Sequence, residues 1–131
     1  MNAEYSELDY PLQQLTKQII AAAIEVHRLL GPGYVEKIYE NALVVELTSR
    51  GHQVTRQMTL DVKYKESLVG QHRLDVLVDG CVVLELKSVE ALNAAHKAQL
   101  RSTLKAANKR VGLLLNFNQA TLRNGIARVV N

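Results

Sequence analysis

Apolar residues recur every three or four positions in the first third of the chain. Residues 12–30 keep this helical spacing, and Pro11 just before them is a residue type favoured in the first turn of a helix. The Gly-Pro-Gly sequence at 31–33 ends that helix, because glycine and proline interrupt the helical backbone. Helical spacing resumes near Tyr34 and ends at Gly51. The pattern therefore predicts two consecutive helices joined by a short turn.

After Gly51 the period of the pattern changes to two. Residues 54–64 alternate between two faces, which predicts a half-buried strand. Residues 68–78 form a second predicted strand, and the Asp-Gly pair at 79–80 is typical of a tight hairpin that leads into a third strand at 81–89. The third strand is apolar on both faces except at two positions, which indicates a central place in the sheet.

Helical spacing returns at residues 91–107 and is followed by a short apolar strand at 110–117. Because a helix separates this strand from the third one, the two can lie parallel, joined by a right-handed crossover. The tail at 119–131 is consistent with either a short helix or an edge strand. The order αα-βββ-α-β predicts an α/β sandwich around one mixed central sheet.

The length of 131 residues fits a single domain, in which residues 1–10 form a polar N-terminal arm. With 47% hydrophobic and 22% charged residues, the composition is that of a globular protein rather than a disordered one. The single cysteine excludes an internal disulfide and favours a reducing compartment. No segment has the pattern of an export signal or a membrane span. We therefore expect a cytoplasmic protein with no membrane partner.

Two charged residues, Glu85 and Lys87, interrupt the apolar third strand. They are two positions apart, so they point to the same face near the middle of the predicted sheet. A buried ion pair contributes little stability, and a polar cleft is the better explanation for both charges. Asp75, on the second strand across the hairpin, is also flanked by apolar residues. These three residues are the first candidates for a functional site.

The length of the hairpin loop decides whether Asp75 can meet Glu85. A two-residue loop pairs Val78 with Cys81, which places Asp75 opposite Leu84 and turns it away from Glu85. A three-residue loop, or a bulge, shifts the register by one and brings Asp75 opposite Glu85. The sequence leaves both alternatives open.

Converging carboxylates beside a lysine predict a site for a hard cation, Mg²⁺ or Mn²⁺, because such ions prefer oxygen ligands. A metal held by Asp75 and Glu85 would polarise a scissile phosphate and lower the pKa of a bound water. Lys87 would position that water and stabilise the developing negative charge. The expected reaction is hydrolysis of a phosphodiester bond.

Asp75 followed by Glu85 and Lys87 resembles the D-x(n)-E-x-K signature of the PD-(D/E)xK nuclease superfamily. Residues 33–39 resemble the motif that gives the GxxExxY branch of that superfamily its name. The resemblance runs from about residue 15 to residue 117. It implies a restriction-endonuclease-like core, similar to the element order predicted above, and a nuclease activity on DNA or RNA.

The resemblance also implies further site residues. An acidic residue on the helix before the sheet is matched by Glu36, which would join Asp75 and Glu85 as a metal ligand, and Glu40 one turn later could assist. A glutamine on the helix after the third strand is matched by Gln99, which would orient the site. Relatives usually have a tyrosine four residues after that glutamine, and here the residue is Thr103.

The formal net charge of +3 permits a polyanionic partner without requiring one. Basic residues recur at four-residue steps on and after the third helix, and they predict either a nucleic-acid contact, DNA in the first place, or a solvated face. His72 and Arg73, just before Asp75, have the same two interpretations. The basic stripe consists of Lys97, Arg101, Lys105 and Lys109.

The sequence supports two functional hypotheses. The first is a metal-dependent nuclease that uses the residues named above. The second is a non-catalytic nucleic-acid-binding or assembly module that has kept the nuclease fold, and Thr103 motivates it. A homodimer formed through apolar residues of the tail, Ile126, Val129 and Val130, is a further hypothesis.

Overall fold

The computed structural model describes residues 7–131 of the chain. Residues 1–6, which hold most of the predicted polar arm, lie outside the described residues. The elements are α2 (Tyr10–Leu30), α3 (Glu36–Ser49), β1 (Val54–Tyr64), β2 (Ser67–Val78), β3 (Val82–Lys87), α4 (Ala94–Ala107), β4 (Val111–Asn116), a 3₁₀ turn η1 (Leu122–Gly125) and β5 (Ile126–Val130).

The five strands form one mixed sheet in the order β1-β2-β3-β4-β5. Only β3 and β4 are parallel, and α4 is the crossover between them, as the helical spacing before the last predicted strand suggested. The tail adds both a 3₁₀ turn and an edge strand, β5, which pairs antiparallel with β4. The predicted α/β sandwich around a mixed central sheet is confirmed.

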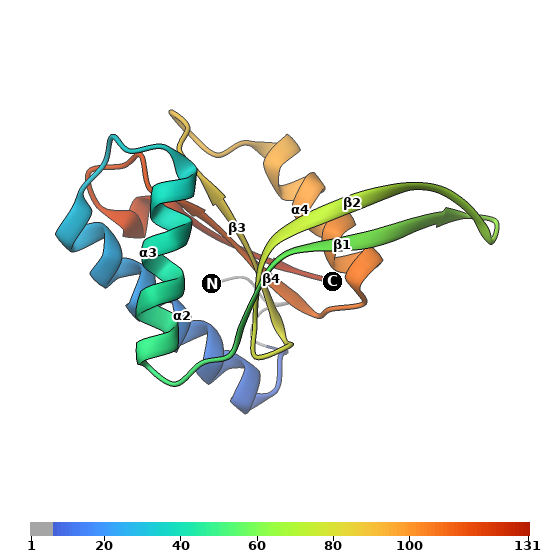
Figure 1. Cartoon of the computed structure of the whole chain (residues 1–131), viewed down its shortest axis with the longest axis horizontal. Coiled ribbons are helices and arrows are strands. Elements are labelled where there is room, and N and C mark those ends of the chain that lie inside the picture. The colour runs from blue at the N-terminus through green and yellow to red at the C-terminus, as the bar shows by residue number, and fades with distance from the viewer. Residues whose placement is uncertain (1–6) are drawn as a thin grey trace.

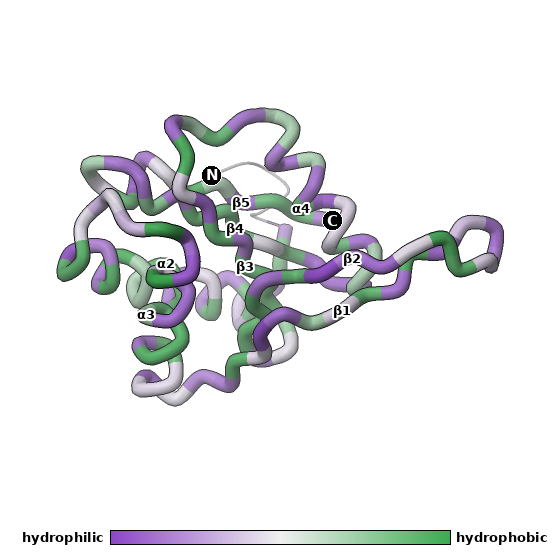
Figure 2. Tube along the Cα trace, turned by 45° about the horizontal axis from the view of Figure 1, so that its top comes forward, coloured by the Kyte–Doolittle hydropathy of each residue, from purple (hydrophilic) through white to green (hydrophobic). Residues whose placement is uncertain are grey.

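Helices cover both faces of the sheet (Figures 1 and 2). Helices α2 and α3 pack on one face, where Ile19, Tyr39 and Leu43 meet the even-numbered residues of β3. Helix α4 packs on the other face through Leu100 and Leu104, against the odd-numbered residues of β3 and β4's Leu114. This alternation explains why β3 is apolar on both faces, and it makes the charges of Glu85 and Lys87 exceptional.

The tail is part of the protein's own core rather than a free apolar surface. Val129 packs on the α4 side of the sheet and Val130 on the α2 side, with exposed fractions of 2% and 7%. Val129 and Val130 therefore do not present an exposed apolar surface for a dimer, and the homodimer through the tail stays a prediction. Within the described residues, no helix is long and apolar enough to cross a membrane.

Strands β1 and β2 extend beyond the body of the protein as a long hairpin arm (Figure 1). Near the body, Val76 faces α2 and α3, whereas Leu60 and Leu74 further out face α4. All three have even numbers, so regular alternation along the two strands would place them on the same face. The ribbon thus changes face between these positions, where Gln57 has a left-handed backbone with φ of 53°. Asp75 lies across from Gln57 at this change of face.

Candidate functional site

The β2–β3 hairpin brings Asp75 into register with Glu85. Val78 pairs with Val82 and Val76 with Leu84, so the loop has three residues and the second of the two predicted registers is present. Continuing this register by one position places Asp75 opposite Glu85. The loop is held by the carboxylate of Asp79, which accepts hydrogen bonds from the backbone of Gln53 and from His52 at 2.7 and 2.8 Å.

Strand β2 leaves β3 just beyond this point. The backbone pairing ends at Val76 and Leu84, and the side chain of Asp75, rather than a β2 carbonyl, accepts the N–H of Leu86 at 3.2 Å. Because β2 turns outward into the arm (Figure 1), the last residues of β3 have no β2 backbone partner on that side. Glu85 and Lys87 therefore lie beyond the end of the β2–β3 ladder, with their side chains 20% and 19% exposed.

Glu85 is half-buried and has few partners. Its Oε1 lies 3.7 Å from Nζ of Lys87, and only about a fifth of each side chain is exposed, 20% and 19%. Its Oε2 is buried and has no hydrogen-bond partner among the described residues. Burial raises the pKa of Glu85 above its ordinary value, Lys87 opposes this effect, and the negative charge of Asp75 adds to it.

Asp75 is in a similar environment. Burial raises the pKa of Asp75, the hydrogen bond from Leu86 opposes the shift, and the carboxylates of Glu40 and Glu36 add to it. Acidic side chains from β2, β3 and α3 therefore act on one another at a single place. Such crowding of negative charge is unfavourable without a cation, and it is typical of functional sites.

Glu36 lies in the first turn of α3 and reaches the end of β3. Its Oε1 accepts the N–H of Ser88 at 3.3 Å, and the hydroxyl of Ser88 donates to the carbonyl of Tyr34 at 3.0 Å. These residues, with Gly33 and Lys37, line an open pocket of about 560 Å³. The start of α3 is thus fixed to the end of the strand that carries Glu85 and Lys87.

The tyrosine of the motif at 33–39 has a structural role. Tyr39 is fully buried and stacks on Phe117, with 4.5 Å between ring centroids. Its hydroxyl donates to the carbonyl of Gly31 at 2.5 Å and accepts the N–H of Tyr34 at 3.1 Å. Both bonds hold the turn that precedes Glu36, so Tyr39 fixes the position of this carboxylate.

The sequence suggested that Glu40 could assist at the metal site, but its carboxylate is already engaged by other residues. It is 5% exposed, and Oε2 accepts hydrogen bonds from Nε and Nη2 of Arg56 at 2.9 and 2.8 Å. Gln57 donates to its Oε1 at 2.9 Å and Lys37 approaches Oε2 at 3.4 Å. These donors come mainly from β1, so Glu40 ties α3 to the base of the arm.

Gln99 lies on α4 with an exposed side chain that makes no hydrogen bond to the other described residues. One turn later, the hydroxyl of Thr103 donates to the Gln99 carbonyl at 3.0 Å and lies 2.7 Å from Nε2 of His72 on β2. Thr103 therefore joins α4 to the hairpin arm. No local sequence pattern could predict this contact, because the two residues lie 31 positions apart.

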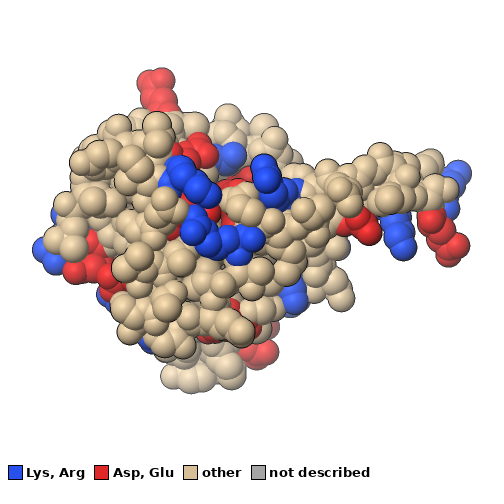
Figure 3. All heavy atoms as spheres, viewed as in Figure 1, with Lys and Arg blue, Asp and Glu red and all other residues tan. Residues whose placement is uncertain are grey.

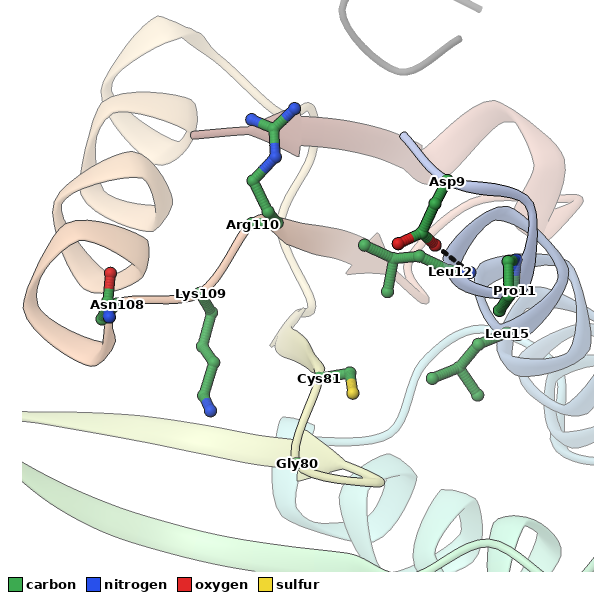
Figure 4. Close-up of a pocket in the computed structure, with 9 residues that line it drawn as sticks. All are labelled: Asp9, Pro11, Leu12, Leu15, Gly80, Cys81, Asn108, Lys109 and Arg110. Atoms are coloured by element: carbon green, nitrogen blue, oxygen red, sulfur yellow. Dashed lines mark hydrogen bonds between the residues drawn. The ribbon is translucent and has the colours of Figure 1, made fainter. Parts of the chain in front are cut away.

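The predicted basic stripe is shorter than expected. Lys97, Arg101 and Lys105 are exposed on α4, but the helix ends at Ala107. Lys109 follows the left-handed cap residue Asn108 and lines a different pocket of about 400 Å³ with Gly80 and Cys81 (Figure 4). That pocket lies at the opposite end of β3 from Lys87. Figure 3 shows Lys and Arg side chains gathered around carboxylates near the base of the arm.

The pair Asp75 and Glu85 fits a hard divalent cation. Among residues 7–131 no group of three or more His, Cys, Asp and Glu side chains is arranged to hold a metal ion. Mg²⁺, however, is commonly held by only one or two carboxylates and keeps several waters. The buried oxygen of Glu85 needs a positive partner or a donor, which a hydrated cation provides. Glu36 is not close enough to complete a group of three in this structure, but its charge acts on Asp75.

Comparison with known proteins identifies one match. Residues 13–129 match the family model described as PD-(D/E)XK nuclease superfamily, which covers most of the chain. No curated protein and no solved structure matches.

Proposed function

The chain belongs to the PD-(D/E)XK nuclease superfamily, and from this premise we propose that it is a metal-dependent nuclease that hydrolyses phosphodiester bonds in DNA or RNA. Membership implies a nucleic-acid substrate. The observation that carries the proposal is the buried Oε2 of Glu85, which has no hydrogen-bond partner among the described residues, on a side chain whose pKa both Lys87 and Asp75 influence. The motif at 33–39, with Glu36 and Tyr39 at its defining positions, supports placement in the GxxExxY branch.

In this proposal Asp75 and Glu85 hold Mg²⁺ or Mn²⁺, with Glu36 as an additional ligand. A divalent cation held there would supply Lewis-acid chemistry, polarising the scissile phosphate and lowering the pKa of the attacking water. The raised pKa values of Asp75 and Glu85 are consistent with a site that is stable only when a cation offsets the paired negative charges.

Lys87 has two tasks in the proposed reaction. Its ammonium lies 3.7 Å from Glu85 and is positioned by it, so it can hold the attacking water by a hydrogen bond. The same positive charge stabilises the negative charge that develops on the phosphate oxygens. Gln99 orients the site from α4, and Lys97, Arg101 and Lys105 contact phosphates of the substrate, DNA in the first place.

The test is a cleavage assay with labelled DNA and RNA oligonucleotides in the presence of Mg²⁺ or Mn²⁺. The wild-type protein is expected to cut one of them, and Lys87→Ala is expected to lower the rate by about 100-fold or more, because it removes transition-state charge stabilisation. The thermal unfolding midpoint of Lys87→Ala should stay close to that of the wild type.

A matched control is Lys17→Ala, which removes an exposed lysine on α2 and should leave the rate unchanged. Cleavage that persists in Lys87→Ala removes this lysine from the mechanism. A folded wild-type protein that binds nucleic acid but cuts neither substrate with either metal refutes the nuclease proposal and favours the non-catalytic module.

A further inference from the structure

A groove runs between the hairpin arm and α4. It has a volume of about 440 Å³ and is lined by residues of β1, β2 and α4. The polar side chains that line it are Asp61, Lys63, His72, Ser102 and Lys105. Lys63 and Lys105 come from opposite walls, and neither forms an ion pair with another described residue. Asp61, the one carboxylate, already accepts a hydrogen bond from Gln71 at 3.0 Å.

The arm is fixed against α4, so the groove is a built feature of the fold. Leu60 and Leu74 of the arm pack on Leu100 and Leu104 of α4. Above this contact, His72 meets Thr103. Because the hydroxyl of Thr103 donates to the Gln99 carbonyl, it accepts the hydrogen that Nε2 of His72 carries. The width of the groove is thus set by apolar packing and by one hydrogen bond across it.

The groove shares strand β2 with the candidate site. His72 lines the groove three positions before Asp75 on this strand, and it is among the groups that act electrostatically on Glu85. Tyr64 follows Lys63 on β1, outside the residues that line the groove, and has 64% of its surface exposed. Nζ of Lys65 lies 5.4 Å from the centre of the Tyr64 ring, over one of its faces. An exposed aromatic ring next to a basic groove is a common arrangement for stacking bases of a single strand.

We propose that this groove binds one single strand of the nucleic-acid substrate, with phosphates on Lys63 and Lys105 and a base stacked on Tyr64. The inference deepens the proposed nuclease function and rests on it for the identity of the substrate. The volume falls in the range of about 300–1,000 Å³ that is typical of small-ligand pockets, which suits one or two nucleotides and excludes an enclosed duplex.

The test is a binding measurement by fluorescence anisotropy without divalent metal and with a chelator present. The probes are a labelled oligodeoxythymidylate of about 12 nucleotides, within the size range of single-strand sites, and a duplex of the same length. The wild-type protein should bind the single strand more tightly than the duplex. Lys63→Ala/Lys105→Ala should weaken single-strand binding by about ten-fold and reduce the slope of log K against log salt by about 1.4, since each phosphate contact contributes about 0.7.

Two further variants make the result specific. Tyr64→Ala should weaken binding by about five-fold or more, because base stacking on an aromatic ring is worth at least about 1 kcal/mol. The charge-matched control Lys17→Ala/Arg123→Ala removes two exposed cations outside the groove and should leave affinity and salt slope unchanged. Thermal unfolding of each variant verifies that it is folded.

The inference is overturned if Lys63→Ala/Lys105→Ala binds like the wild type, if the duplex binds more tightly with the same dependence on these lysines, or if the wild-type protein binds neither probe. Because no cleavage occurs without metal, the result is independent of the nuclease activity. A protein that binds the strand in the groove but never cuts it would refute the proposed function alone.

Discussion

Two glutamates with little exposure to water, Glu40 on α3 and Glu85 on β3, have different surroundings. At the contact between α3 and β1, Glu40 is surrounded by donors from Arg56, Gln57 and Lys37. At the open end of β3, Glu85 has only Lys87 at 3.7 Å, and one of its oxygens has no hydrogen bond among the described residues. Both carboxylates are largely removed from water, so the difference lies in the partners that the fold supplies.

The comparison separates a structural carboxylate from a candidate functional one. A buried charge is tolerated when paired and fully hydrogen-bonded, as Glu40 is. Glu85 and Asp75 are left with raised pKa values, which means that the fold alone does not stabilise their ionised forms. Carboxylates with raised pKa values are typical of functional sites, and a bound cation would stabilise their ionised forms.

The largest expected effect on stability is at the contact between α3 and β1, where Glu40 lies. Arg56→Ala leaves Glu40 buried without its main partner, and the free energy of unfolding should fall by about 3 kcal/mol. The matched control is Arg50→Ala, which breaks an exposed pair with Glu46 at 2.7 Å and should cost about 0.5 kcal/mol or less. Urea unfolding of both variants at neutral pH gives the comparison, and equal losses would contradict the claim that Arg56 stabilises a buried charge on Glu40.

In the candidate site, we expect a substitution that raises the free energy of unfolding instead of lowering it. Asp75→Asn removes the buried charge and keeps an acceptor for the N–H of Leu86, so it should raise the free energy of unfolding at pH 7 by about 0.5–2 kcal/mol. The pKa of Asp75 is raised in the folded state, so ionisation of Asp75 disfavours folding as pH rises through that raised value.

The gain in stability from Asp75→Asn should therefore shrink as pH falls, and vanish below the ordinary pKa of 3.8, where Asp75 is protonated in both the folded and the unfolded state. Urea unfolding at a series of pH values measures this dependence. A loss of stability at pH 7, or a gain that does not change with pH, would show that burial does not disfavour the charge of Asp75.

The order and type of the elements followed from the sequence because hydrophobic period is a local property. The predicted helices, hairpin and parallel strand all lie where the spacing changes, with boundaries shifted by a few residues. Local signals also gave the two possible registers of Asp75 and Glu85. These local signals could not choose between the two registers, because the three-residue loop is held by a hydrogen bond from the backbone of Gln53 to Asp79, 26 positions away.

Long-range partners explain what the sequence could not reveal. Glu36 and Glu40 occupy the same face of one helix, but only the second meets Arg56, 16 positions away on β1. Likewise, the alternation of β1 gives no hint that the ribbon changes face at Gln57. Lys109 continued the four-residue spacing of α4, yet the helix ends before it at the left-handed Asn108. Tertiary contacts, not composition, decide these cases.

The central claim is that Asp75 and Glu85 form a site for a divalent cation, and calorimetric titration with Mn²⁺ tests it most directly. The wild-type protein should release or absorb heat with saturating stoichiometric binding, and Glu85→Gln should weaken that binding by more than about ten-fold, because it removes a charged oxygen ligand. Glu66→Gln, an exposed substitution at the tip of the arm, should bind like the wild type. Equal binding in Glu85→Gln, or no binding in the folded wild-type protein, would contradict the account.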